Sequence, residues 1–211
     1  MSKIKICGLF RDDDISFANE AGPDYAGFVF ALSKRQVSPK QAAHLRTWLR
    51  YDIVPVGVFV NAPVGEIAAL YRDGVIGIAQ LHGDEDSNYI AVLKEQTAAN
   101  TSGPIPVIKA VRVESREDIL GAAGVEADYR LLDNGAGGTG KRFDWTLLRD
   151  GEFLGGLPVP CFLAGGIDVY TMEEALLFKP FGIDVSSGAE TGGRKDRDKM
   201  LRLVEMVRNW K

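Results

Sequence analysis

The sequence predicts a single-domain α/β protein, a (β/α)8 TIM barrel that spans residues 1–211. Short apolar runs rich in Val, Ile, Leu and Phe return at intervals of roughly 25 residues, and amphipathic stretches separate them. The runs are apolar almost throughout, as in strands that are buried on both faces of a parallel sheet. Eight such strands close a barrel, and a chain of 211 residues falls at the small end of that fold's range.

We expect strands at residues 3–9, 25–30, 54–60, 76–82, 106–113, 128–134, 161–166 and 182–187. We expect helices at residues 13–21, 38–50, 63–73, 87–98, 115–123, 171–178 and 196–209. Several of these helices begin with Ser, Thr, Asp or Pro, which are favoured at helix starts. The sixth connection, 135–156, is irregular and has only a short helical piece near 144–149. An open doubly wound sheet is the alternative, but it more often carries a G-x-G-x-x-G turn after its first strand, and CGLFRD at 7–12 is not one.

Composition narrows the class of protein. Hydrophobic residues make up 45% of the chain and charged residues 26%, which excludes a disordered or low-complexity scaffold. A net charge of −4 argues against a sequence-independent nucleic-acid binder. No secretory signal and no membrane-spanning apolar run of ~18 residues is found. We therefore expect a cytoplasmic protein with a small-molecule partner, no nucleic-acid or membrane partner, and either a monomeric or a homodimeric state.

Barrel enzymes carry their chemistry at the carboxyl ends of the strands. Cys7 ends the first strand, where it is either a small core residue or a thiolate base, and a thiolate needs a nearby cation or a polar site. Asp133 ends the sixth strand, where it either bonds the backbone of the turn or acts as a general acid whose pKa is raised by burial. Cys161 begins the seventh strand, at the opposite end, and is predicted to be core.

Glycine-rich turns follow three of the predicted strands. The loop after Asp133 includes Gly137, Gly138, Thr139 and Gly140, which allow close approach to a ligand or a mobile lid. The last two strands end in glycine and serine turns, at the pair of loops where barrels commonly bind phosphate. The predicted phosphate-binding residues are Gly165, Gly166, Ser186, Ser187 and Gly188. No P-loop pattern occurs, so a nucleotide site of that type is not supported.

Three further polar residues are candidates for substrate binding. Arg35 is either a solvated charge or a bidentate clamp for a substrate carboxylate. Asp184 interrupts an apolar strand and therefore needs a partner, which is a substrate donor or else Lys109 or Arg112. His82 ends the fourth strand and bonds either the backbone or the substrate. No cluster of His, Asp and Glu at ligand spacing occurs, so we expect no metal site.

In sum the chain resembles the phosphoribosylanthranilate isomerase family of tryptophan biosynthesis nearly from end to end. The matching motifs are KICGL at 5–9, VGVFVN at 56–61, QLHG at 80–83, VIKAV at 107–111, LD at 132–133, GGTG at 137–140, FDW at 143–145, LAGGI at 163–167, IDVSSG at 183–188 and GRKD at 193–196. The departures are modest: the family often has Ser-Pro-Arg at 33–35 and Thr at 10, and an Asn-Val pair is missing from 167–171. These departures concern loop shape only.

The resemblance implies an Amadori rearrangement of N-(5-phosphoribosyl)anthranilate without cofactors. It implies that Cys7 is the general base, Asp133 the general acid and Arg35 the contact of the anthranilate part. It also implies that the last two turns hold the phosphate.

Four alternatives stay open. An indole-glycerol-phosphate synthase is expected to use a catalytic lysine, and a histidine-pathway isomerase an Asp in place of Cys7. A metal-dependent epimerase needs paired His and Asp ligands. A non-catalytic sugar-phosphate-binding barrel has no use for Cys7 opposite Asp133.

Overall fold

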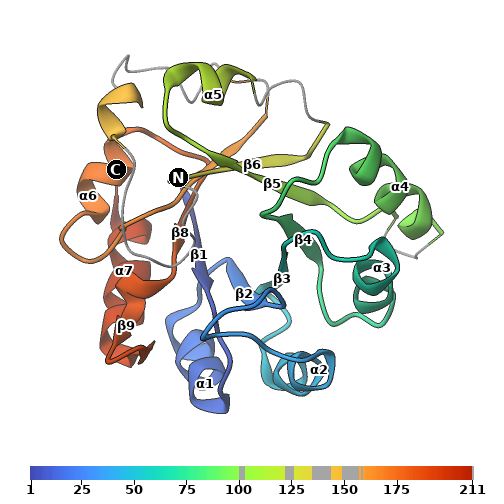
Figure 1. Cartoon of the computed structure of the whole chain (residues 1–211). Helices are drawn as coiled ribbons and strands as arrows, with labels where there is room; N and C mark the ends of the chain where they lie inside the picture. Colours follow the sequence, from blue (N-terminus) through green and yellow to red (C-terminus); the bar gives the residue numbers. More distant parts are fainter. Residues whose placement is uncertain (100–102, 122–125, 135–143, 149–156, 158, 211) are drawn as a thin grey trace.

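The computed structural model describes residues 1–99, 103–121, 126–134, 144–148, 157 and 159–210. Within them, eight parallel strands form a closed barrel in chain order, because β1 pairs with both β2 and β8 (Figure 1). The strands are β1 (Lys3–Cys7), β2 (Tyr25–Val29), β3 (Val54–Phe59), β4 (Ile78–Leu81), β5 (Val107–Arg112), β6 (Tyr129–Asp133), β7 (Cys161–Leu163) and β8 (Gly182–Val185). The predicted (β/α)8 barrel is therefore confirmed.

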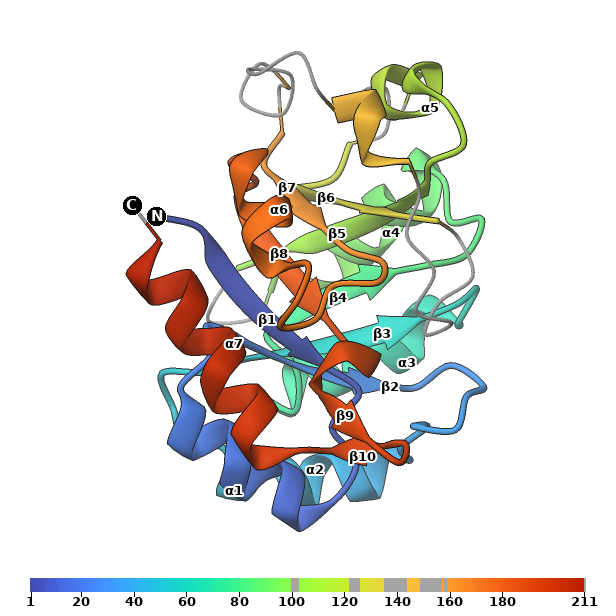
Figure 2. The same cartoon turned by 90° about the vertical axis from the view of Figure 1, so that its left-hand side faces the viewer.

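Helices surround the barrel, and α7 and α1 lie side by side along one flank (Figure 2). The helices are α1 (Asp12–Ala21), α2 (Pro39–Trp48), α3 (Val64–Arg72), α4 (Ser87–Thr97), α5 (Arg116–Gly121), α6 (Met172–Leu177) and α7 (Arg197–Asn209). Short 3-10 segments, η2 (Trp145–Leu148) and η3 (Ser187–Ala189), follow β6 and β8. None of the helices in the described part of the chain combines the length and the apolar character that crossing a membrane requires.

Local sequence determines where the helices begin. The Ser38 hydroxyl accepts a hydrogen bond from the Gln41 backbone N–H at 3.2 Å, and Pro39 takes the first helical position of α2. The Asp196 carboxylate accepts from the Lys199 backbone N–H at 3.1 Å at the start of α7. Each cap satisfies a backbone donor that has no partner inside the helix. Such caps explain why the predicted starts of these two helices agree with the structure to within a residue.

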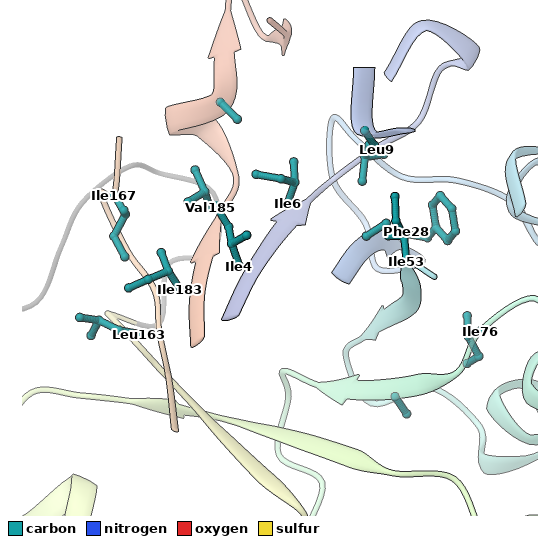
Figure 3. Close-up of a cluster of buried hydrophobic side chains, with 14 of the residues drawn as sticks. Ile4, Ile6, Leu9, Phe28, Ile53, Ile76, Leu163, Ile167, Ile183 and Val185 are labelled. Atoms are coloured by element: carbon teal, nitrogen blue, oxygen red, sulfur yellow. The ribbon is translucent and has the colours of Figure 1, made fainter. Parts of the chain in front are cut away.

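Alternate residues of the strands face two different cores. On β1 and β8, Ile4, Ile6 and Val185 belong to the layer between barrel and helices (Figure 3). A second cluster fills the barrel interior with Tyr25, Val56, Ile78, Ile108, Leu131, Phe162 and Ala164. Because side chains alternate along a strand, Lys5 and Cys7 face the interior with this second cluster. The apolar filling of the barrel therefore gives way to polar side chains toward the carboxyl ends of the strands.

The predicted strands extend past the observed ones, and in two of them glycine is the reason. The strand predicted at 3–9 ends at Cys7, and the strand predicted at 161–166 ends at Leu163. Gly8 follows Cys7 with φ +81°, and Gly165 and Gly166 have φ of +85° and +64°. Such angles lie outside the β region, so the chain turns even though the apolar run continues.

A short hairpin between β8 and α7 was not predicted. It consists of β9 (Glu190–Thr191) and β10 (Arg194–Lys195), which pair antiparallel. The turn residues Gly192 and Gly193 have φ of +59° and +76°, as a tight two-residue hairpin turn requires. The hairpin places Glu190 directly opposite Lys195.

Candidate active site

The side chains that end β1 and β6 are buried at the carboxyl edge of the barrel. Cys7 and Asp133 are each 7% exposed. Gly27 on β2 leaves room for the thiol, since a Cβ at this position would lie 2.8 Å from the Cys7 Sγ atom. The carboxyl ends of parallel strands meet at one face of a barrel, so the thiol and the carboxyl belong to the same face.

A buried ion pair lies beneath this edge of the barrel. Of its two residues, only Asp184 was named in the sequence analysis. The Lys5 Nζ atom donates to Asp184 Oδ1 at 2.9 Å and to Gln80 Oε1 at 2.8 Å, and the Lys5 side chain is completely buried. Burial opposes the charge of Lys5, but the Asp184 carboxylate raises the Lys5 pKa above its ordinary value. Lys5 is therefore an ammonium ion held inside the barrel by a carboxylate.

The expectation that Lys109 or Arg112 is the protein partner of Asp184 is wrong. Lys109 pairs with Glu85 at 2.9 Å, and Arg112 pairs with Glu114 on the surface at 2.6 Å. Closure of the barrel pairs Lys5 on β1 with Asp184 on β8 in register. Adjacent strands put these two inward-facing side chains in contact, whereas β5 lies elsewhere in the barrel.

The Cys7 thiol has the cations that a thiolate needs, yet burial outweighs them. Burial raises the pKa of Cys7 above its ordinary value of 9.0, although the charge of Lys5 and that of Lys195 both lower it. A hydrogen bond with Lys5 also favours the thiolate. In the protein without ligand, Cys7 is therefore a thiol at neutral pH, in surroundings where an added positive charge promotes its ionisation.

The surroundings of the Asp133 carboxyl favour its protonated form more than water does. Burial raises the pKa of Asp133 above the ordinary value of 3.8, against a hydrogen bond from the Asn134 backbone N–H and the attraction that His82 exerts when it is protonated. The His82 Nε2 atom lies 3.6 Å from Asp133 Oδ2, and its Nδ1 atom lies 3.3 Å from Gln80 Nε2. Burial lowers the pKa of His82, so the imidazole is neutral at pH 7. Its ring thus contacts side chains of the site rather than the backbone.

The Lys5–Asp184 pair joins the two candidate catalytic groups electrostatically. The charges of Lys5 and Asp184 act on the pKa of Cys7 and also on that of Asp133. The pair is therefore a common neighbour of a group able to take a proton and a group able to give one. Such an arrangement suits general acid–base chemistry on one small molecule.

The loops after β7 and β8 are packed against each other, as a shared binding site requires. A Cβ atom on Gly188 would clash with the carbonyl oxygen of Ile167, so only glycine allows this approach of the two loops. Gly165 and Gly166 turn the first loop away from the strand. Ser186 and Ser187 lie at the end of β8 and the start of η3. The residues predicted to bind phosphate are thus brought together.

Arg35 is not a free surface charge. Its guanidinium donates from Nε and Nη2 to the two carboxylate oxygens of Glu190, at 2.6 and 2.8 Å. The aliphatic part of Arg35 passes over Gly8, where any Cβ would clash with it. Arg35 therefore lies directly beside the residue that follows Cys7, at the same edge of the barrel.

Other predicted residues have simpler outcomes. Cys161 is buried at the start of β7, as predicted. The glycine loop with Gly137, Gly138, Thr139 and Gly140 lies outside the described residues. Among the residues that the structure describes, no group of three or more His, Cys, Asp or Glu side chains is placed to hold a metal ion.

Sequence reasoning gave no role to four buried polar residues at or beneath this edge: Lys5, Gln80, Glu190 and Lys195. Lys5 could have been found from the sequence, because it lies two residues before Cys7 in an apolar strand. The two side chains therefore point to the same face of the strand. Glu190 and Lys195 were less visible, because they become buried only when the hairpin folds over Arg35.

Comparisons with known proteins identify the family of the chain. Residues 4–206 match the family profile described as N-(5'-phosphoribosyl)anthranilate isomerase. The chain therefore belongs to the phosphoribosylanthranilate isomerase family, and it is an isomerase. A relative of that name from Endomicrobium trichonymphae is 44% identical over 99% of this chain and 100% of its own length. One from a Thermoanaerobacter species is 42% identical over 99% of this chain and 98% of its own.

Solved isomerases of this family share the fold. The phosphoribosylanthranilate isomerase from Thermotoga maritima has a TM-score of 0.82 at 32% identity, with all of both chains covered. The enzyme from Thermus thermophilus has a TM-score of 0.82 at 30% identity, with 98% of each chain covered. A further solved isomerase, with a TM-score of 0.81 at 31% identity and full coverage of both chains, is in complex with reduced 1-(o-carboxyphenylamino)-1-deoxyribulose 5-phosphate. The resemblance read from the sequence motifs is thus confirmed.

Proposed function

We propose that this isomerase catalyses the Amadori rearrangement of N-(5-phosphoribosyl)anthranilate to 1-(2-carboxyphenylamino)-1-deoxyribulose 5-phosphate, an aldose–ketose isomerisation in tryptophan biosynthesis. One observation carries the proposal. A buried thiol at the end of β1 and a buried carboxyl at the end of β6 share the Lys5–Asp184 ion pair as electrostatic neighbours. An isomerisation that removes one proton and adds another needs such a pair of groups.

Asp133 acts first, as the acid. The furanose ring opens when its oxygen receives a proton, and the bond between that oxygen and the anomeric carbon breaks. A carboxyl with the free pKa of ~3.9 holds almost no proton at pH 7. Burial of Asp133 raises its pKa and so increases the protonated fraction. The anilino nitrogen supplies the electrons, which leaves a Schiff base with a positive charge.

Cys7 acts next, as the base. The Schiff base makes the neighbouring C–H of the sugar acidic, and the Cys7 thiolate removes this proton to give an enolamine. The positive charge of the intermediate also favours the thiolate over the thiol, which counters the effect of burial on the Cys7 pKa. Catalysis and ionisation therefore support each other. The enolamine then tautomerises to the keto product, which restores the atom balance of an isomerisation.

The remaining residues bind substrate. Arg35 contacts the carboxylate of the anthranilate part, and the backbone of Gly165, Gly166, Ser186, Ser187 and Gly188 holds the phosphate. His82 and Asp184 contact the opened sugar, since both flank the catalytic pair. The glycine loop at 137–140 lies outside the described residues, and its role as a ligand-contacting loop or a lid stays a prediction from the sequence. No step needs a metal or an organic cofactor.

The test is a fluorescence assay. Purified protein is given phosphoribosylanthranilate, without any additive, and its fluorescence is followed. We expect an enzyme-dependent fall in fluorescence that EDTA does not change. Binding without any fall would support the non-catalytic sugar-phosphate-binding barrel, and a loss of rate on chelation would support a metalloenzyme.

We propose that the enzyme is cytoplasmic and that it is either a monomer or a homodimer. Both states occur in the description of one solved relative, which presents monomers generated from the dimeric phosphoribosylanthranilate isomerase of Thermotoga maritima. Sedimentation of the purified chain distinguishes the two states, and subcellular fractionation tests the location.

A further inference from the structure

The carboxylate of Glu190 is the meeting point of two cations at the active-site edge. It accepts hydrogen bonds from Arg35 Nε at 2.6 Å, Arg35 Nη2 at 2.8 Å and Lys195 Nζ at 2.7 Å. The Glu190 side chain is 5% exposed and that of Lys195 is fully buried. Burial works against ionisation, but hydrogen bonds from Arg35 and the charge of Lys195 hold the Glu190 pKa below its ordinary value. The carboxylate is thus a buried anion that faces two cations.

The hairpin fixes this carboxylate to the barrel. Lys195 Nζ also donates to the carbonyl oxygen of Ser186 at 2.9 Å, in the loop after β8. Lys199 Nζ, from the first turn of α7, donates to the backbone oxygen of Glu190 at 2.6 Å. The charged group that holds Arg35 is therefore anchored on the same loop that carries the predicted phosphate site.

The contact with Glu190 leaves part of the guanidinium unused. Two of its nitrogens face Glu190. Within the described part of the chain, the third nitrogen, Nη1, has no hydrogen-bond partner. A guanidinium can bond two carboxylates at once, one along each edge of its fork. Free Arg side chains lose considerable rotamer entropy when they bind, and the bidentate bond to Glu190 has already fixed this one.

We propose that Glu190 is a positioning residue, which holds Arg35 in the orientation that receives the substrate's carboxylate. The proposal rests on the proposed function, because it takes the anthranilate carboxylate as the ligand of Arg35. Lys195 supplies the second counter-charge that keeps Glu190 ionised in a buried place. Through Lys195 and Ser186, the carboxylate end and the phosphate end of the substrate site are parts of one hydrogen-bonded frame.

Glu190→Gln is the informative substitution. Glutamine keeps the size of the side chain, but its amide nitrogen is a donor and must face a donor of Arg35 or of Lys195. Arg35 then loses its fixed orientation. Glu20→Gln is the matched control, because Glu20 also bonds an arginine, Arg197, through both oxygens, but on the surface beside α7.

The measurement compares two ligands by calorimetry. One is reduced 1-(o-carboxyphenylamino)-1-deoxyribulose 5-phosphate, and the other is the same compound without the carboxylate. In the unchanged protein and in Glu20→Gln, we expect the carboxylate to improve the dissociation constant about 10- to 100-fold, as charge-assisted hydrogen bonds do. In Glu190→Gln this ratio should fall to within about threefold of the ratio in Arg35→Ala.

Two results would overturn the proposal. If Glu190→Gln weakens both ligands equally, or lowers only the melting temperature, Glu190 has a merely structural role. If the carboxylate adds nothing to binding in the unchanged protein, Arg35 is not its receptor. A different result would show that the proposed function itself is wrong: the unchanged protein would not turn over phosphoribosylanthranilate. The kinetic counterpart is a rise in KM with little change in kcat.

Discussion

Lys5 and Asp184 are 179 positions apart in the chain, and their side chains form a 2.9 Å ion pair across the seam where β1 meets β8. The pair lies beneath the thiol and the carboxyl that we assign to catalysis. Buried pairs are sensitive to loss of one member, since removal of one charge leaves the other without compensation and costs about 3–5 kcal/mol. The seam of the barrel and the electrostatics of the site therefore depend on the same two residues.

We predict that Lys5→Met slows the alkylation of Cys7 by iodoacetamide at neutral pH. The substitution removes a cation that lowers the Cys7 pKa and leaves the Asp184 carboxylate, which raises it. The thiolate fraction therefore falls. The rate is measured in a Cys161→Ser background, so that Cys7 is the thiol under study.

The matched control for this prediction is Lys3→Met. Lys3 is on the same strand, is half exposed and pairs with Asp24. Alkylation should keep its rate in this control. If Lys5→Met does not fold, the double variant Lys5→Met/Asp184→Asn removes the uncompensated anion and keeps the test. Equal alkylation rates in Lys5→Met and Lys3→Met would show that Lys5 does not influence the ionisation of Cys7.

Cys7→Ser should reduce kcat by about 10²- to 10⁴-fold, the usual contribution of a general base. A hydroxyl ionises far less readily than a thiol, whereas the shape of the site is kept. Substrate binding should therefore change little, which steady-state kinetics with phosphoribosylanthranilate would record. Cys161→Ser, at the other end of the barrel, should keep full activity. A near-normal kcat in Cys7→Ser would end the assignment of the base.

Asp133→Asn should reduce kcat by a similar factor, about 10²- to 10⁴-fold. An amide has no proton to give to the ring oxygen. The suitable control is Asp128→Asn, since Asp128 precedes the opposite end of β6 and bonds the backbone of Val107. That variant is expected to lose some stability but to retain its turnover. Full activity in Asp133→Asn would mean that another group is the acid.

Gly27→Ala tests the space beside the thiol. A methyl group here would lie 2.8 Å from the Cys7 Sγ atom and 3.0 Å from its Cα atom. Such overpacking costs about 1–3 kcal/mol and moves the thiol, so both melting temperature and kcat should fall. Gly65→Ala in α3 is the control, because no atom lies within 4 Å of the added methyl. It should raise stability by about 0.5–1 kcal/mol. Unchanged kcat in Gly27→Ala would show that the thiol tolerates displacement.

The stability of the protein should decline in acid, partly through Glu85. Burial opposes its ionisation, but the Lys109 ammonium and the Asn61 backbone N–H hold its pKa below the ordinary 4.5. A carboxyl whose pKa is lowered by folding adds stability above its unfolded pKa, and this is lost as the pH falls through the folded value. Glu85→Gln should therefore show a smaller decrease in melting temperature below pH ~4.5 than the unchanged protein. Asp73→Asn, an exposed substitution at the end of α3, should show the full decrease.

Much of the fold could be predicted because the strands and helices are locally encoded. Runs of β-branched residues recur with the spacing of a barrel, and caps such as Ser38 and Asp196 mark where helices begin. The ends of the strands were harder to predict. Gly8 ends β1 because its φ angle is positive, and the hydrophobic pattern of the sequence does not reveal that angle.

Candidate catalytic residues could likewise be found from their position in the chain. Cys7 and Asp133 each follow an apolar run, and the fold places such residues at one face. The partner of Asp184 could not be found in this way, because only closure of the barrel pairs β8 with β1 and so selects Lys5 over Lys109 or Arg112.

The sequence by itself determined the barrel, the family and the strand ends that carry the chemistry, since these depend on hydrophobic periodicity and short motifs. Tertiary structure alone decided the charges around them. Lys5 became the partner of Asp184, and Glu190 became the partner of Arg35, through contacts between distant segments. The physical reason is that burial and ion pairing, which set the pKa values of the site, depend on which side chains folding brings together in space.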